Sequence, residues 1–152
     1  MLTIKTSRLL LVPHTAETIR RWKTDRSEME RFTGRTPYGL QLEDWAMHEL
    51  ETAFDPWLKN IESHPAQAGW YSGWEIVLAA ENIGIGGIGC AGPPDENGEI
   101  IIGYHVDLRH RRQGIAAEAV AGLTDWAFGL PEVRSVVATI PSWRRSRKRF
   151  RA

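Results

Sequence analysis

The clearest hydrophobic pattern lies in residues 99–129, where a strand-like run gives way to a helical period. Residues 99–106 read EIIIGYHV, an apolar and aromatic run behind the turn-forming segment 93–98. The apolar positions that then recur every three or four residues are Ile115, Ala119, Leu123 and Ala127. Gly114 stands between the two patterns, and the sequence GLP at 129–131 is a stop signal. A strand, a tight turn and an amphipathic helix are therefore predicted here.

The rest of the chain also alternates between strand and helix patterns. Further strands are predicted at residues 2–13, 70–80, 83–91 and 134–140. Helices are predicted at 15–22, with Thr15 as N-cap, and at 42–61, which Pro56 could divide. The helix between the strands that end at Val106 and begin at Arg134 implies a crossover with parallel pairing. The expected fold class is α/β, an antiparallel meander followed by a βαβ unit.

The strand at 83–91 is unusual because it reads IGIGGIGCA. Gly84 and Gly86 could begin a dinucleotide fingerprint, but the third glycine and the following helix of that motif are absent. The better interpretation is a strand that bulky neighbours or a ligand approach closely.

Composition indicates one soluble globular domain. The chain has 152 residues, of which 42% are hydrophobic and 25% charged. Its seven tryptophans are expected to pack the core or line a groove. A single cysteine, Cys90, excludes an internal disulfide framework and fits a reducing, cytoplasmic location. No apolar run is long enough to span a bilayer, and there is no signal-peptide pattern.

The net charge of zero hides an uneven distribution. Residues 144–151 read RRSRKRFR and hold six of the 19 cationic residues, which leaves 13 basic against 19 acidic residues elsewhere. An acidic body favours a cationic amine over nucleic acid as a partner. The basic tail is the feature that would favour nucleic acid, but it carries no recognised binding motif.

The turn before the helix predicted from Ile115 has the features of an anion site. A helix start presents unpaired N–H groups and the positive end of the helix dipole. Arg109, Arg111 and Arg112 stand beside it, and Gly114 has no Cβ to keep an anion away from the backbone. The pattern predicts a phosphate or pyrophosphate site.

Two segments resemble a known family. Residues 111–116 read RRQGIA and are similar to the R/Q-x-x-G-x-G/A acetyl-CoA motif of the GNAT N-acetyltransferases. Residues 6–13 read TSRLLLVP and resemble the T-x-R-L-x-L-x-P opening of the branch that contains the ribosomal-protein N-terminal acetyltransferases RimJ and RimL. The resemblance implies the GNAT fold with a splayed cofactor cleft. It also implies acetyl-CoA as co-substrate, no metal, and direct attack by a primary amine, from a protein N-terminus or a small molecule.

The resemblance also implies which residues bind the cofactor. Backbone groups of Val106 and Leu108 would meet the pantetheine arm, and an N–H near Val106 would hold the oxyanion. The N–H groups around the pyrophosphate would be those of Arg111, Arg112, Gln113, Gly114, Ile115 and Ala116. Arg112 stands where many relatives have glycine, so its side chain must point outward.

The general base is less well defined. Many relatives place a glutamate two residues before the Gly-Tyr pair, where this chain has Ile101. Glu99 lies on the same strand face and could act through a water, or be a solvated turn residue. Glu75 is the second candidate. His105 is interpreted as a packed or half-exposed strand residue, and Glu118 as a residue that orients the turn.

The family pattern stops after about residue 141, where Trp143 occupies the position of an expected asparagine. Residues 1–141 are therefore expected to form an acetyltransferase domain whose C-terminal strands are missing through truncation or a frameshift. Residues 142–152 are expected to be a basic tail. An exposed sheet edge would invite a homodimer, and a weakly active or inactive acyl-CoA-binding protein is the main alternative function.

Overall fold

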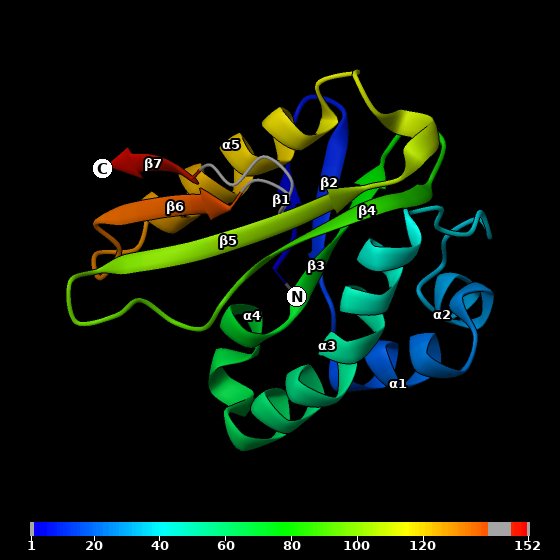
Figure 1. Cartoon of the computed structure of the whole chain (residues 1–152), viewed down its shortest axis with the longest axis horizontal. Coiled ribbons are helices and arrows are strands. Elements are labelled where there is room, and N and C mark those ends of the chain that lie inside the picture. The colour runs from blue at the N-terminus through cyan, green and yellow to red at the C-terminus, as the bar shows by residue number, and fades with distance from the viewer. Residues whose placement is uncertain (1, 140–146, 152) are drawn as a thin grey trace.

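The computed structural model describes residues 2–139 and 147–151 and contains a seven-stranded sheet in the order β1-β2-β3-β4-β5-β6-β7 (Figure 1). The strands are β1 (Ile4–Lys5), β2 (Leu9–Pro13), β3 (Gly73–Leu78), β4 (Ile83–Cys90), β5 (Glu99–Val106), β6 (Ser135–Thr139) and β7 (Arg147–Arg151). The α-helices are α1 (Ala16–Thr24), α2 (Arg26–Phe32), α3 (Asp44–Ser63), α4 (Ala68–Tyr71) and α5 (Ile115–Phe128). Neighbouring strands pair antiparallel except β5 and β6, which are parallel.

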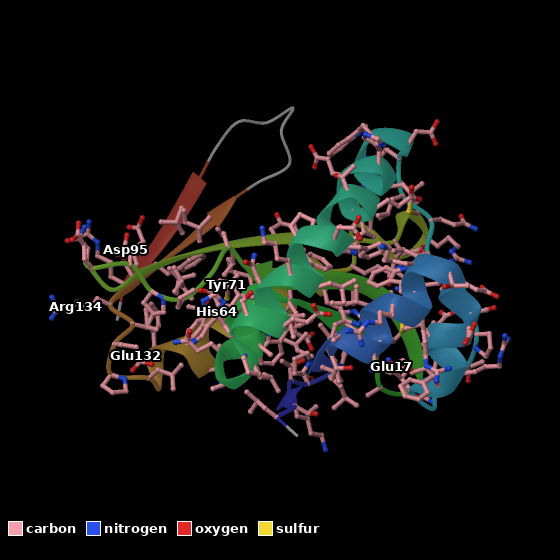
Figure 2. The ribbon with its side chains drawn as sticks, turned by 90° about the horizontal axis from the view of Figure 1, so that it is seen from below. Glu17, His64, Tyr71, Asp95, Glu132 and Arg134 are labelled. Atoms are coloured by element: carbon pink, nitrogen blue, oxygen red, sulfur yellow. The ribbon has the colours of Figure 1, made fainter. Side chains whose placement is uncertain are left out.

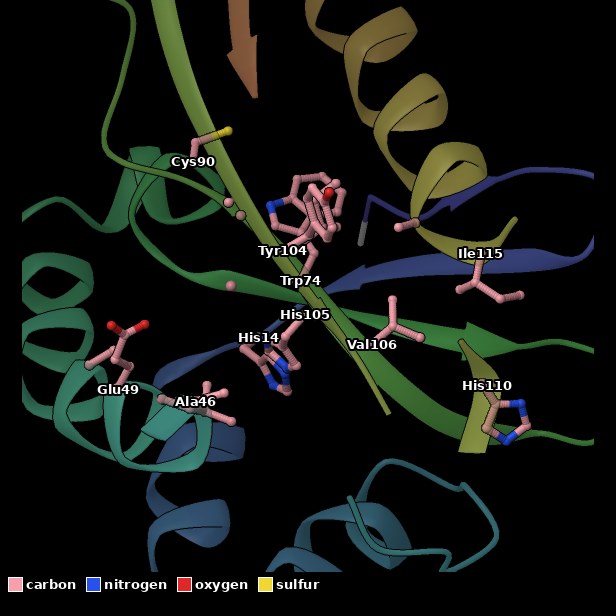
Figure 3. A pocket seen from close by; sticks show the side chains of 18 of the residues that line it. His14, Ala46, Glu49, Trp74, Cys90, Tyr104, His105, Val106, His110 and Ile115 are labelled. Carbon is pink, nitrogen blue, oxygen red and sulfur yellow. The ribbon is translucent and has the colours of Figure 1, made fainter. Parts of the chain in front are cut away.

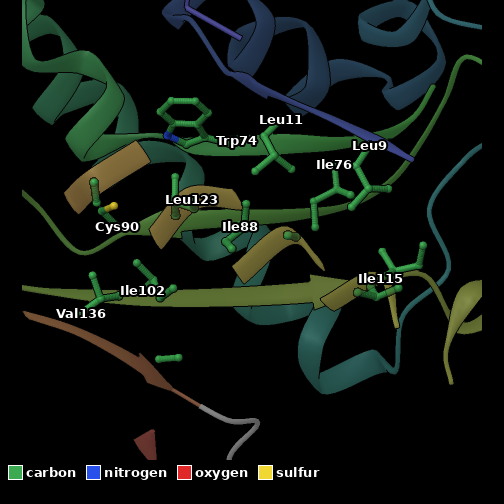
Figure 4. Close-up of a cluster of buried hydrophobic side chains, with 14 of the residues drawn as sticks. Leu9, Leu11, Trp74, Ile76, Ile88, Cys90, Ile102, Ile115, Leu123 and Val136 are labelled. Atoms are coloured by element: carbon green, nitrogen blue, oxygen red, sulfur yellow. The ribbon is translucent and has the colours of Figure 1, made fainter. Parts of the chain in front are cut away.

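Helices cover both faces of the sheet. The apolar stripe of α5 packs against side chains of β2 to β6 and forms the larger core, in which Trp74, Ile88 and Leu123 are buried (Figure 4). Helices α1 to α3 lie over the other face around a second cluster that includes Ile19, Met29 and Phe54 (Figure 1). Among the described residues, no helix has both the length and the apolar character needed to cross a bilayer.

The alternation of isoleucine and glycine in β4 separates the two faces. Ile85 and Ile88 are buried in the core beneath α5. The intervening glycines leave room for side chains on the opposite face, which α1 to α3 cover. A Cβ at Gly87 would lie 2.5 Å from Cε1 of His105. One at Gly73 of β3 would lie 2.9 Å from the Trp57 indole of α3. The prediction that bulky neighbours approach this strand is confirmed.

The predicted strand, turn and helix at residues 99–129 are confirmed by β5 and α5, and the parallel pairing with β6 is confirmed as well. The capping of α1 by Thr15 is also confirmed, since Thr15 and Thr18 form a reciprocal capping box. Both predictions rested on strong local signals.

Other boundaries were wrong. Residues 2–13 form a hairpin because the Thr6 N–H bonds to the Leu9 carbonyl at 2.9 Å and closes a turn. Residues 68–71 are helical rather than extended, and α2 was not foreseen. Pro56 does not divide α3, which is anchored on both sides of the proline by buried Phe54 and Ile61. His64 at the end of α3 stacks on Tyr71 of α4, with ring centroids 4.7 Å apart (Figure 2).

Strand β7 lies within the predicted basic tail at 142–152, where no strand was expected. Residues 147–151 pair antiparallel with β6, from Ser135↔Arg151 to Thr139↔Arg147. Strand pairing is made by backbone groups, so an arginine-rich segment without an apolar alternation can still form an edge strand. The edge of β6 is thus covered, and the outer strand on this side of the sheet is β7. Trp143 and Ser146 lie outside the described residues.

Candidate functional site

Two residues in the turn between β5 and α5 have left-handed backbone conformations. Gly114, the N-cap of α5, has φ +76° and supplies no side-chain cap to the helix start. Arg112 has φ +60°, a region that residues other than glycine seldom adopt. This conformation explains why glycine suits position 112. The backbone N–H groups at the start of α5 therefore face outward around a residue with no Cβ.

Arg8, which is far from this turn in the sequence, forms hydrogen bonds that stabilise it. Its Nη1 donates to the Gln113 carbonyl at 2.9 Å, and its Nε donates to Oε1 of Glu118 at 2.7 Å. Oε2 of Glu118 accepts bonds from the Arg8 N–H at 2.8 Å and the Thr6 hydroxyl at 2.5 Å. The two sequence motifs, 110 residues apart, are thus bonded directly to each other. Glu118 orients the turn, as expected.

A cavity of about 940 Å³ opens beside the turn (Figure 3). It lies between α3, the β4–β5 pair and the start of α5. Pairing of β5 with β6 runs only from Glu99 to Ile102, and within the described part of the chain Gly103 to Val106 have no partner strand on that side. The cavity is lined by these four residues, so it opens beside the part of β5 that β6 does not pair with.

Most of the predicted cofactor residues line this cavity. Those that do are Val106, Arg111, Arg112, Gly114, Ile115 and Ala116. Leu108, which is 44% exposed, and Gln113 do not line it, although both lie in the same turn.

Comparison with known proteins decides the family. The acetyltransferase (GNAT) domain model matches residues 8–145. This chain belongs to the GNAT acetyltransferase family. The family's general reaction is acetyl-CoA-dependent N-acetylation.

The individual relatives of this GNAT chain are distant. The uncharacterized N-acetyltransferase YjdG of Bacillus subtilis (strain 168) is 38% identical over 68 residues, which are 45% of this chain and only 40% of that protein. RimJ of Mycobacterium smegmatis, solved with CoA-disulfide, has a TM-score of 0.59 at 18% identity, covering 93% of this chain and 69% of its own. The ribosomal-protein-S5-alanine acetyltransferase of Vibrio fischeri has a TM-score of 0.55 at 14% identity, and the match covers 91% of this chain and 73% of that one. These two structures share the GNAT fold with the chain.

Two of the three arginines expected to charge the site are neutralised by acids. Arg109 forms a fork with Asp107, at 2.8 and 2.9 Å, and lies over the Tyr38 ring. Arg111 binds both oxygens of Glu43 at the start of α3, at 2.7 and 2.8 Å. Hydrogen bonds from Arg111 lower the pKa of Glu43 to about 2. Arg112 is the one of these three arginines for which no acidic partner is found among the described residues.

Neither glutamate proposed as the base lines the cavity. Glu99 is the first residue of β5, about 20 Å along the strand from Val106, and it accepts a bond from the Ser135 hydroxyl at 3.3 Å. Glu75 is 1% exposed and is held by Arg26 at 2.6 Å and by Nε2 of His14 at 3.2 Å. Burial alone raises the pKa of Glu75, but Arg26 and His14 outweigh it and bring it to about 2. The geometry thus holds Glu75 in a buried ion pair, and neither glutamate faces the cavity among the described residues.

Two further residues line the cavity, and the sequence alone gave both a structural interpretation: Cys90 as a small apolar residue and His105 as a packed or half-exposed strand residue. Cys90 lines the cavity wall, and burial raises the pKa of its thiol to about 12, so the thiol is protonated at neutral pH. This matches its interpretation as a small apolar residue. His105 also lines the cavity, where only a packed strand residue was expected. No local sequence signal marks His105, because its environment is made by β3, β4 and α2.

Proposed function

We propose that this chain transfers an acetyl group from acetyl-CoA to a primary amine by direct attack. The observation that carries the proposal is the position of the cavity, which joins the unpaired end of β5 to the Gly114-capped start of α5. Backbone N–H groups at a helix start suit a pyrophosphate, and free strand backbone suits the amide-bearing pantetheine arm. The donor set therefore fits acetyl-CoA, which would supply the activated thioester.

In this proposal each part of the site has one task. The turn from Arg111 to Ala116 holds the pyrophosphate, and the backbone near Val106 polarises the thioester carbonyl. The acceptor enters from the α3 side, where Trp45, Glu49 and Trp57 line the cavity. The name of the ribosomal-protein-S5-alanine acetyltransferase structure makes a protein with an alanine amine one acceptor to test, beside small amines.

Thiol release from acetyl-CoA tests the proposed transfer. The chain should release thiol only when an amine is present, in a panel of alanine-ended peptides and small primary amines. Mass spectrometry should find one added acetyl group on the amine. The competing function, acyl-CoA binding with little turnover, is favoured by the absence of Glu75 and Glu99 from the cavity lining. CoA binding without amine-dependent thiol release would select it.

Replacing Arg8 with methionine should weaken CoA binding even though Arg8 does not line the cavity. Loss of its bonds to Gln113 and Glu118 frees the turn, so the Kd for CoA should rise by about tenfold, equal to roughly 1.4 kcal/mol. Arg20→Met is the matched control, because Arg20 makes only exposed ion pairs with Glu17 and Glu62. Calorimetry that finds equal CoA affinity for the two variants would contradict the role given to Arg8.

A further inference from the structure

His105 shares a row of paired residues with Gly87 and Glu75. Gly87 of β4 is paired with Glu75 of β3 on one side and with His105 of β5 on the other. Residues directly opposite each other in antiparallel strands project to the same face of the sheet. The side chains of Glu75 and His105 therefore lie on one face, with no side chain between them.

The imidazole of His105 occupies the space that Gly87 leaves. A Cβ on Gly87 would lie 2.5 Å from Cε1 and 2.9 Å from Nε2 of the ring. Figure 3 shows His105 and Tyr104 leaving β5 on opposite sides, with His105 near His14 in the cavity view. The glycine thus lets the ring lie across the middle strand in the wall of the cavity.

Nε2 of His105 is buried and forms no hydrogen bond with any described residue. Among the described residues that line the cavity, Oγ of Ser72 is the other buried polar atom without a hydrogen-bond partner. Buried polar atoms are nearly always satisfied, so two unsatisfied ones in a cavity wall indicate partners supplied by a ligand. Burial lowers the pKa of His105 to about 4. The Glu75 carboxylate of β3 opposes this effect, while Arg26 of α2, His14 and Arg111 reinforce it. The ring is therefore neutral at pH 7 and able to accept a proton.

Building on the proposed acetyl transfer, we propose that His105 is the catalytic base, and that its unbonded Nε2 accepts the proton lost by the acceptor amine during attack. The neutral amine nitrogen forms a bond to the acetyl carbon, the carbon–sulfur bond breaks, and CoA leaves as a thiolate. The proton released from nitrogen passes to Nε2, and from there to solvent, while the thiolate takes a proton from water. Nitrogen bonded to the acetyl carbon is far more acidic than a free ammonium, so a weakly basic imidazole suffices.

His105→Gln tests the proposal. It should lower kcat by about a hundredfold, the usual scale for loss of a general base, while the Kd for CoA measured by calorimetry stays within about twofold. Gly87→Ala should give a similar loss of kcat with the imidazole still present, because the added Cβ displaces the ring. His64→Gln is the control, since His64 stacks on Tyr71 outside the cavity.

A readout independent of activity is the NMR titration of His105 in the free protein. The ring should titrate near pH 4, and Gly87→Ala should move that value toward the ordinary 6.5 of histidine. Wild-type kcat in His105→Gln, with CoA binding intact, would overturn the inference and leave the proposed function standing. A wild-type chain that binds CoA but acetylates no amine would overturn both.

Discussion

Replacing Glu75 with glutamine should lower the free energy of unfolding by about 3 kcal/mol, because it breaks a buried ion pair and leaves the Arg26 guanidinium only the more distant carboxylate of Glu30, at 3.7 Å. The charge left behind is Arg26, whose guanidinium also lies 4.5 Å from the Trp22 ring centroid. Urea denaturation followed by circular dichroism measures the change. Glu17→Gln is the matched control: its ion pair with Arg21 is exposed and should contribute only about 0.5 kcal/mol.

The same carboxylate should make stability depend on pH. The pKa of Glu75 is lowered from 4.5 to about 2 in the folded chain, so its contribution is complete above about pH 4.5 and is lost as the pH falls toward 2. The shift corresponds to about 3 kcal/mol. Glu75→Gln should lack this part of the acid transition, and an unchanged acid slope in the variant would contradict the ion pair.

Replacing Gly114 with valine should have the largest effect on ligand binding, with the Kd for CoA rising about a hundredfold, or roughly 2.7 kcal/mol. A φ of +76° is strained for any residue that has a Cβ. The branched side chain of valine would also cover the N–H groups at the start of α5. The nearest atom to an added Cβ is Nη2 of Arg8 at 3.5 Å, so lack of space is not the cause.

Gly34→Val is the matched control for Gly114→Val. Gly34 has almost the same φ, +77°, open space around it and no place in the cavity lining. Both variants should lose about 1–2 kcal/mol of stability through backbone strain, but only Gly114→Val should lose CoA binding. Equal CoA affinity in the two variants would show that the helix start does not contact the ligand.

The sequence predicted the fold best where a local pattern and a tertiary role agreed. The run at 99–106, the glycine at 114 and the period from Ile115 each indicated the element that the structure contains. The hairpin at 2–13 was missed because the whole segment was interpreted as one strand, although the polar residues 5–8 divide its two apolar parts. Strand β7 was missed because its arginines carry no apolar alternation, and its pairing depends on β6.

The binding half of the site was more predictable than the catalytic half. The turn at 111–116 is contiguous in the sequence, so its motif could be recognised. The environment of His105 is assembled from β3, β4 and α2, and its decisive feature is the missing Cβ of Gly87. Glu75 looked like a candidate base in the sequence, but its partner Arg26 is 49 residues away and came from a helix that was not foreseen.

The most direct test of the account is a ¹H–¹⁵N NMR titration of the whole chain with CoA. Amide signals of Gly114, Ile115 and Ala116, together with those of Gly103 to Val106, should shift most and saturate together with one Kd. The amide chemical shifts of the β7 residues should not change. Largest shifts outside the β5–α5 turn, or no shifts at millimolar CoA, would contradict the claim that this turn holds the cofactor.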